Sequence, residues 1–172
     1  MVDYLSTLDK HFDGIKEIMA LNEPILLKVL HEIGVIKILV SYSGSGDSGE
    51  IDDIEFFTEG DFAPSNIDVQ DLAHDRLVEI HVLGSSYISD KWIPDLQTEL
   101  VALYTAIEYY CNDWLEIEHP GYENDDGGQG EMTINVVEGE FILDHNDRYV
   151  QLANTITLRT AELLISGPTM EI

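Results

Sequence analysis

The chain has 172 residues, of which 44% are hydrophobic, enough to bury one core but too few for two comfortable domains. Its 34 Asp and Glu residues outnumber its eight Lys and Arg residues, which gives a formal net charge of -26. Such a charge disfavours direct binding of nucleic acid and attracts cations and basic protein surfaces. The apolar content excludes a disordered chain, and we expect a single domain over residues 1–172.

The negative charge is concentrated in the later part of the chain. Residues 1–40 contain six acidic and four basic residues, whereas residues 41–172 contain 28 acidic and four basic residues. Fourteen carboxylates and no Lys or Arg lie between Lys91 and Arg148. Ordinary surfaces mix both signs. A halophilic origin would explain the excess, but the normal charge balance of the first forty residues argues against it.

The single cysteine, Cys111, has no partner for an internal disulfide. The N-terminal stretch MVDYLSTLDKHF has neither the basic segment nor the apolar segment of a secretion signal, and no apolar run is long enough to cross a bilayer. We therefore expect a cytoplasmic protein without membrane contact.

Two helices are predicted in the helical segment 1–34. Apolar residues at helical spacing predict the first one: Leu5, Leu8, Phe12, Ile15 and Met19. The second is expected to begin with Asn22 as its N-cap and Pro24 in its first turn, and to end at Gly34.

A hairpin is predicted over residues 35–57. Alternation at Ile36, Ile38, Val40 and Tyr42 predicts a strand, and SGSGDSGE is a glycine-rich turn before a second strand, IDDIEFF. The Gly-Asp-Ser-Gly stretch resembles the surroundings of the nucleophile in trypsin-like enzymes. Glu50 replaces the second glycine of that motif, and only His11 and His31 precede Ser48, so we interpret Ser48 as a turn residue.

The middle of the chain, residues 58–92, is predicted to be an acidic loop region. Residues 58–76 lack a period, residues 77–83 alternate as a third strand, and residues 84–91 are irregular. A long helix is then expected over residues 94–114. Its apolar stripe comprises Leu96, Leu100, Leu103, Ile107, Cys111 and Trp114.

A second β unit is predicted within residues 115–172. Met132, Ile134 and Val136 alternate with polar residues, Glu138-Gly139 is a tight turn, and EFILDHNDRYV returns as a strand. The stretch ITLRTAELLI is compatible with a last strand or a short helix. Together these elements predict an α+β fold, an antiparallel sheet of four to six strands with the N-terminal helices and the long central helix on one face. Its open face is expected to carry Asp53, Glu55, Glu79 and either Glu138 or Glu140, with their neighbours, as an acidic surface.

Three other groups are candidates for chemistry. The loop from Glu118 to Glu131 is rich in oxygen ligands and glycine, as calcium or magnesium sites are, but it lacks the EF-hand spacing. His145 beside Asp144 and Asp147 could form an acid-base site, although a hydrogen-bonded strand end is the more common role of such a residue. Cys111 lies on the apolar helix stripe and is expected in the core. We expect no cofactor and no resident metal.

Three segments resemble an uncharacterised domain family of bacterial plasmids and phages: VIKILVSYSGSGDSGEIDDI, PGYENDDGGQGEMTINV and FILDHNDRYV. The shared features are a Gly-x-Gly-Asp-Ser-Gly turn, a Tyr/Trp-Glu-Asn-x-x-Gly-Gly-x-Gly-Glu loop and a Leu-x-x-Asn-x-Arg-Tyr strand. The resemblance implies a mobile-element context but no mechanism. It also implies that the two glycine loops lie close together, with a shared site at Asp47, Glu123, Asn124 and Arg148.

The charge pattern favours an acidic interaction protein, an inhibitor of a host defence nuclease of the anti-CRISPR or anti-restriction type that acts by nucleic-acid mimicry. The expected partner is a basic nucleic-acid-binding protein, and homodimer formation stays open. The residues expected to bind the partner are Asp47, Glu50, Asp52, Asp53, Glu55, Glu123, Asp125, Asp126, Glu131, Glu138 and Glu140. A small divalent-metal-dependent enzyme that uses the two glycine loops is the alternative, and a structural protein without a ligand is a third hypothesis.

Overall fold

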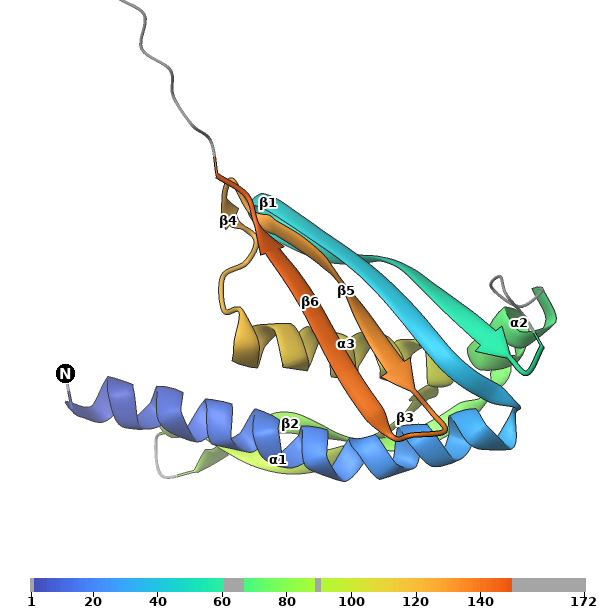
Figure 1. The fold of residues 1–172 in the computed structure, drawn as a ribbon. Helices are drawn as coiled ribbons and strands as arrows, with labels where there is room; N and C mark the ends of the chain where they lie inside the picture. Colours follow the sequence, from blue (N-terminus) through green and yellow to red (C-terminus); the bar gives the residue numbers. More distant parts are fainter. Residues whose placement is uncertain (1, 61–66, 89–90, 150–172) are drawn as a thin grey trace, which may run out of the picture.

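The structure is a computed structural model that describes residues 2–60, 67–88 and 91–149. Within these described residues, three helices and six strands follow one another (Figure 1). Their bounds are α1 Val2–Glu32, β1 Val35–Thr58, α2 Ile67–Asp75, β2 Leu77–Ile88, β3 Lys91–Ala102, α3 Leu103–Glu118, β4 Asn124–Asp125, β5 Gly128–Asn135 and β6 Glu140–Asp147.

The strands form two antiparallel sheets. The larger sheet has four strands in the order β4-β1-β5-β6, and β2 pairs with β3 in a separate sheet. β1 is one 24-residue element that reverses direction at its glycine-rich middle (Figure 1). The Ser43 hydroxyl donates a hydrogen bond to the Asp52 carboxylate across this reversal, at 3.0 Å. The α+β class is therefore confirmed, and the segment predicted as the first hairpin corresponds to the single element β1.

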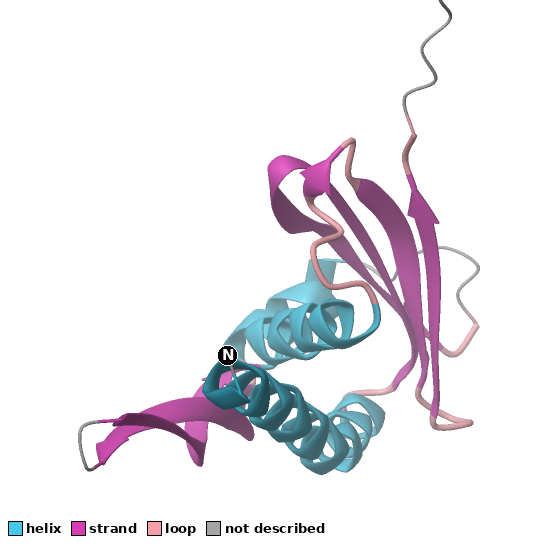
Figure 2. Ribbon diagram, turned by 90° about the vertical axis from the view of Figure 1, so that its left-hand side faces the viewer, coloured by secondary structure: helices cyan, strands magenta, loops and turns pink. Residues whose placement is uncertain are grey.

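Helices α1 and α3 lie between the two sheets (Figure 2). Leu26 and Leu30 of α1 and Ile107 of α3 are fully buried. They form one core with Ile38, Val40, Ile54 and Phe56 of β1, Ile80 of β2, and Met132 and Ile134 of β5. The alternation predicted for both β units thus directs their apolar residues into the core.

The prediction of two N-terminal helices was wrong, because α1 continues through Pro24 without a break. Asn22 is not an N-cap. Its side chain is 3% exposed and bonds sideways to β2: it donates to the His81 carbonyl and accepts from the His81 amide, both at 2.8 Å. The residue that indicated a helix start therefore attaches α1 to the small sheet instead.

The predicted helix over residues 94–114 was also wrong in its first half. Residues 91–102 form β3, which pairs with β2 from Leu77↔Ala102 to Ile88↔Lys91. Leu96 and Leu100 of the expected stripe are 47% and 64% exposed. α3 begins at Leu103 without a side-chain cap, and the Leu103 amide donates to the Arg76 carbonyl at 2.8 Å. In the second half of the stripe, Leu103, Ile107 and Cys111 are buried as expected, and Trp114 is partly buried.

Two loop predictions change as well. Part of the segment 58–76 is the helix α2, which buries Ala73 and leaves Leu72 42% exposed. The third strand is present but continues to Ile88, through residues predicted to be irregular. The stretch ITLRTAELLI lies outside the described residues. Among the described helices, none combines the length and the apolar content that crossing a membrane requires.

The outer face of the larger sheet carries fewer carboxylates than expected. Its rows, read across β1, β5 and β6, are Lys37, Asn135, Glu140; Leu39, Thr133, Ile142; Ser41, Glu131, Asp144; and Ser43, Gln129, Asn146. Lys37 lies over the Phe57 ring at 4.2 Å, and Glu79 belongs to the other sheet. The expected acidic surface is therefore interrupted on this face, since two of the four rows contain no charged side chain.

Candidate functional site at the glycine-rich end of the sheet

The two glycine loops meet at one end of the larger sheet. Strand β4 places Asp125 opposite Gly46 and Asn124 opposite Asp47, and the Arg148 amide donates to the Gly127 carbonyl at 2.9 Å. We call this end the tip and define it as residues 43–52, 119–131 and 144–149. The predicted proximity of the two loops is thus present in the structure.

Gly130 allows two side chains from different strands to meet across β5. It pairs with Tyr42 of β1 on one side and with His145 of β6 on the other. A Cβ at this position would lie 2.5 Å from the Tyr42 hydroxyl and 2.0 Å from the Asp144 carbonyl. Without that Cβ, the Tyr42 hydroxyl reaches His145 Nδ1 at 2.7 Å. The glycine therefore has a packing role.

Other glycines of the two loops have the same kind of role. Gly127 adopts a φ of 76°, and a Cβ there would lie 1.9 Å from the Gly44 carbonyl. A Cβ on Gly128 would lie 2.6 Å from the His145 ring, and one on Gly49 would lie 2.3 Å from the Tyr122 hydroxyl. Position 127 requires glycine, because its φ is positive and a Cβ would overlap backbone atoms, whereas a Cβ at position 49 or 128 would force the Tyr122 or His145 ring to shift.

Four aromatic side chains occupy the space that the glycines leave. The His119 and His145 rings stack at 3.7 Å, and Tyr42 lies parallel to His145 at 5.9 Å. Tyr122 meets Tyr42 edge-on at 5.5 Å. The loop between α3 and β4, which carries His119 and Tyr122, is thereby attached to the end of the sheet.

His145 is bonded at both ring nitrogens, and its side chain is only 4% exposed. The Asp147 carboxylate lies 3.0 Å from Nε2 and accepts the N–H of that nitrogen. In the neutral imidazole, Nδ1 then accepts the hydroxyl proton of Tyr42. This assignment agrees with the raised pKa of Tyr42, about 12, which results from burial and from nearby Tyr122, Asp144 and Asp147.

The shifted pKa values of Asp147, His119 and Tyr122 reflect burial, hydrogen bonding and nearby charged groups around His145 and Tyr42. The hydrogen bond from His145 lowers the pKa of Asp147, and burial together with the adjacent His145 lowers the pKa of His119. Burial raises the pKa of Tyr122, with further contributions from Glu123, Asp52 and Glu50. The tip therefore has negative potential at its surface and a hydrogen-bonded aromatic cluster beneath it.

This arrangement stabilises structure more readily than it performs a reaction. Tyr42 is 1% exposed, so a substrate has little access to its hydroxyl. Ser48 is exposed, and no hydrogen bond joins it to a histidine within the described part of the chain. Cys111 is fully buried, and burial raises the pKa of its thiol. Within residues 2–60, 67–88 and 91–149, no three His, Cys, Asp or Glu side chains converge as metal ligands would.

The structure brings together most, but not all, of the acidic residues expected to bind a partner. Asp47, Glu50, Asp52, Glu123, Asp125, Asp126 and Glu131 belong to the tip. Asp53 and Glu55 follow on the returning half of β1. Glu138 and Glu140 lie at the opposite end of the sheet, in and after the turn between β5 and β6. Asn124 and Arg148 of the expected shared site are exposed at the tip, where Arg148 donates a hydrogen bond to Gln129.

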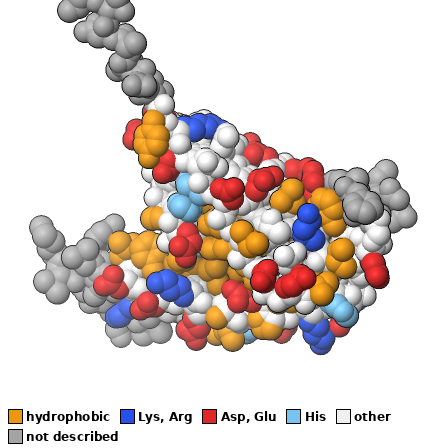
Figure 3. Space-filling model, viewed as in Figure 1, with side chains coloured by type: hydrophobic (Ala, Val, Ile, Leu, Met, Phe, Trp, Pro, Cys, Tyr) orange, Lys and Arg blue, Asp and Glu red, His pale blue; other side chains and the backbone are white. Residues whose placement is uncertain are grey.

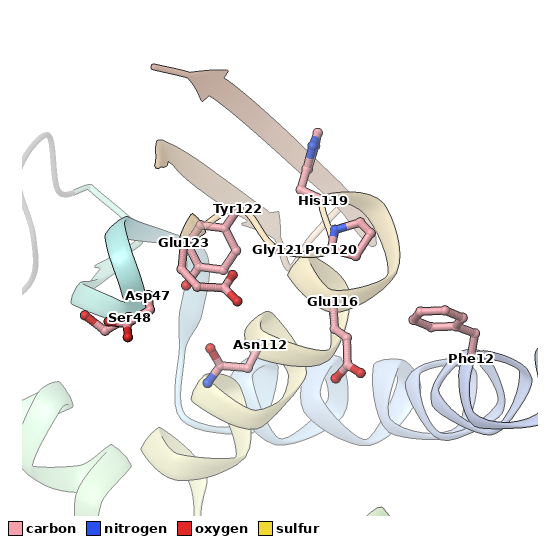
Figure 4. Close-up of a pocket in the computed structure, with 11 residues that line it drawn as sticks. Phe12, Asp47, Ser48, Asn112, Glu116, His119, Pro120, Gly121, Tyr122 and Glu123 are labelled. Carbon is pink, nitrogen blue, oxygen red and sulfur yellow. The ribbon is translucent and has the colours of Figure 1, made fainter. Parts of the chain in front are cut away.

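A hollow of about 580 Å³ lies between the tip and the helices (Figure 4). Asp47, Ser48 and Gly49 of β1 line one wall, and Asn112 and Glu116 of α3 line another. The remaining lining residues are Phe12 of α1 and His119, Pro120, Gly121, Tyr122 and Glu123 of the loop after α3. A second hollow, of about 300 Å³, lies on the outer face and includes Asp52, Glu131 and Asp144.

Sequence reasoning missed the aromatic cluster. Tyr42 lies in the core as predicted, but the sequence predicts no contact between it and His145, for which the expected neighbours are Asp144 and Asp147, and it assigns no role to His119. Tyr122 occupies the Tyr/Trp position of the loop motif, and its spacing from the following glycines was the available signal. What the sequence did not reveal is that Gly130 lies between Tyr42 and His145, because this depends on the register of three strands.

Comparison with known proteins assigns the chain to a family. No curated protein and no solved structure matches it. The model of a family of unknown function, DUF6878, matches residues 18–157, which include the aromatic cluster, both glycine loops and β6. Because the match covers well over half of the sequence, this chain belongs to that family of unknown function.

Proposed function

We propose that this chain is an acidic interaction protein whose tip binds a basic nucleic-acid-binding protein by imitating nucleic acid. The observation that carries the proposal is the gathering of exposed carboxylates at the tip, including Asp47, Glu50 and Asp125. Within the described residues of the tip, Arg148 is the only Lys or Arg. Duplex DNA presents about one negative charge per 1.7 Å of its axis, and a dense group of carboxylates attracts the same basic channels.

Figure 3 shows Asp and Glu side chains over the sheet face and the tip, with few Lys and Arg side chains among them. Surface charges of one sign accelerate encounters with an oppositely charged partner and make binding dependent on salt. The resemblance to plasmid and phage proteins supports a more specific form of the proposal. In that form the partner is a host defence nuclease, and the chain is an inhibitor of the anti-CRISPR or anti-restriction type.

The tip also offers a rigid platform. Tyr42, His145 and Tyr122 pack beneath the loops, and the backbone of Asp47 and Asp125 is paired between β1 and β4. A pre-organised surface loses less conformational entropy on binding than mobile loops do. On this proposal, the buried network positions the acidic loops and takes no part in a reaction.

Affinity capture from a host lysate at low and high salt tests the proposal. We expect a basic nucleic-acid-binding enzyme to be retained at low salt and released at high salt or by added duplex DNA. An enzyme assay of the captured protein is expected to show inhibition without turnover of the inhibitor. If no salt-sensitive partner is recovered, or if duplex DNA does not compete, the proposal is wrong.

A further inference from the structure

The hollow beside the tip differs from the rest of the acidic surface because it is concave and has aromatic residues in its lining. Three parts of the chain that are distant in sequence form it, namely α1, β1 and residues 112–123, and its lining includes Phe12 and Tyr122 together with three carboxylates. No Lys or Arg is among the lining residues. Asp47, Ser48, Gly49 and Glu116 are exposed, so the hollow opens to solvent.

The carboxylates of the hollow are only partly neutralised within the protein. Figure 4 shows Glu123 and Asn112 directed toward the space between the tip and α3. Glu116 has a partner, because its carboxylate accepts a hydrogen bond from His11 at 2.7 Å. No hydrogen bond or ion pair involves the side chain of Asp47 or Glu123 within the described residues. The effect of Glu123, Asp52 and Glu50 on the pKa of Tyr122 indicates negative potential at this wall.

We propose that this hollow receives an arginine side chain of the basic partner, whose guanidinium pairs with Glu123 and Asp47 against the Tyr122 ring. Guanidinium is planar, binds carboxylates through paired hydrogen bonds and stacks on aromatic rings, which matches the lining better than a compact ammonium group does. Arginine side chains in partly desolvated pockets are also common binding hot spots. This inference rests on the proposed function. It attributes the affinity for the partner to the hollow and the electrostatic attraction of the partner to the exposed carboxylates of the tip.

Titration of the full chain with blocked amino acids tests the site without any partner. The probes are N-acetyl-arginine amide, the uncharged isostere N-acetyl-citrulline amide and N-acetyl-lysine amide, followed by the NMR shifts of the Gly49 and Gly121 amides. We expect saturable binding of the arginine probe with a dissociation constant on the order of 1 mM. The citrulline probe is expected to bind about tenfold more weakly or not at all, and the lysine probe several-fold more weakly.

The matched variants are Glu123→Gln in the hollow and Glu140→Gln at the other end of the sheet. Glu123→Gln is expected to weaken the arginine probe about tenfold, whereas Glu140→Gln leaves it unchanged. Asp47→Asn, at an exposed position, is the second test if Glu123→Gln fails to fold. Equal binding of the arginine and citrulline probes, or equal effects of the two glutamine variants, overturns the inference. Salt-sensitive capture of a partner would still stand in that case, so the two proposals fail separately.

Discussion

Gly130 illustrates at the scale of one residue how the sequence motif produces the site. Its missing side chain lets Tyr42 and His145 bond across the middle strand, and His145 then holds Asp147 at its other nitrogen. Glycine is unfavourable inside a strand unless close approach requires it. The glycines of the loop motif therefore have a structural explanation, and the acidic residues between them are the ones left for a partner.

Replacement of Gly130 by alanine is expected to destabilise the fold by about 1–3 kcal/mol, because the new Cβ would overlap the Tyr42 hydroxyl and the Asp144 carbonyl. Denaturant unfolding of the two proteins measures the difference. Gly84→Ala is the matched control on a strand of the other sheet. There the new Cβ would meet only the end of the exposed Gln97 side chain, which can move aside. Equal losses in the two variants would contradict the packing role of Gly130.

The elements show where sequence patterns were sufficient and where they were not. Both β units were predictable, because Ile38, Val40, Met132 and Ile134 alternate with polar residues and are buried. The segment 94–102 was not, because a spacing of four, as between Leu96 and Leu100, satisfies a strand as well as a helix. The N-cap residue of α3 is Ala102, whose side chain cannot cap a helix, so the sequence does not indicate that a helix starts there. The Leu103 amide instead donates to the carbonyl of Arg76, which is distant in sequence.

The contact between α1 and β2 depends on Asn22, which makes two hydrogen bonds to the His81 backbone. Asn22→Ala is expected to lower the unfolding free energy by about 2–4 kcal/mol, because both groups of His81 lose a partner in a partly buried place. Asn112→Ala, at an exposed position of α3, is the control and is expected to change stability by less than about 0.5 kcal/mol. Thermal or denaturant unfolding is the measurement, and similar losses in both variants would sink the assignment.

Asp113 on α3 gives a pH-dependent prediction. Burial and the neighbouring Glu116 raise the pKa of this carboxyl to about 6, and His11 acts in the opposite direction. The folded state therefore favours the protonated form, and stability is lost as the pH rises from about 4 to about 6. Asp113→Asn removes this titration, so at pH 8 the variant is expected to be more stable by about 1–2 kcal/mol, allowing for solvent screening.

The advantage of Asp113→Asn is expected to be mostly lost near pH 4, where the carboxyl is protonated in the folded chain and roughly half protonated in the unfolded chain. Unfolding measured at pH 4 and at pH 8 provides the comparison. Asp9→Asn, at an exposed position of α1, controls for the removal of one negative charge from a very acidic protein. If both variants show the same difference at both pH values, the raised pKa of Asp113 is not the cause.

At the scale of the whole molecule, the charge pattern predicted an acidic surface but not its location. Composition identified residues 41–172 as the acidic part of the chain, yet the structure distributes the carboxylates of its described residues over the tip, the returning half of β1, the small sheet, the helices α2 and α3 and the far turn. This division depends on strand register and on the separation of β2 and β3 into their own sheet, neither of which a single sequence reveals.

Salt-dependent binding of the captured partner tests the central claim most directly when two charge-matched variants are compared. Glu50→Gln with Asp125→Asn removes two carboxylates from the tip, and asparagine suits the φ of 55° at residue 125. Glu138→Gln with Glu140→Gln removes two from the far turn. We expect the tip variant to bind more weakly, by about tenfold or more, and with a reduced dependence on salt, while the turn variant retains both affinity and salt dependence. Equal effects of the two double variants, or no effect of either, would contradict binding through the tip.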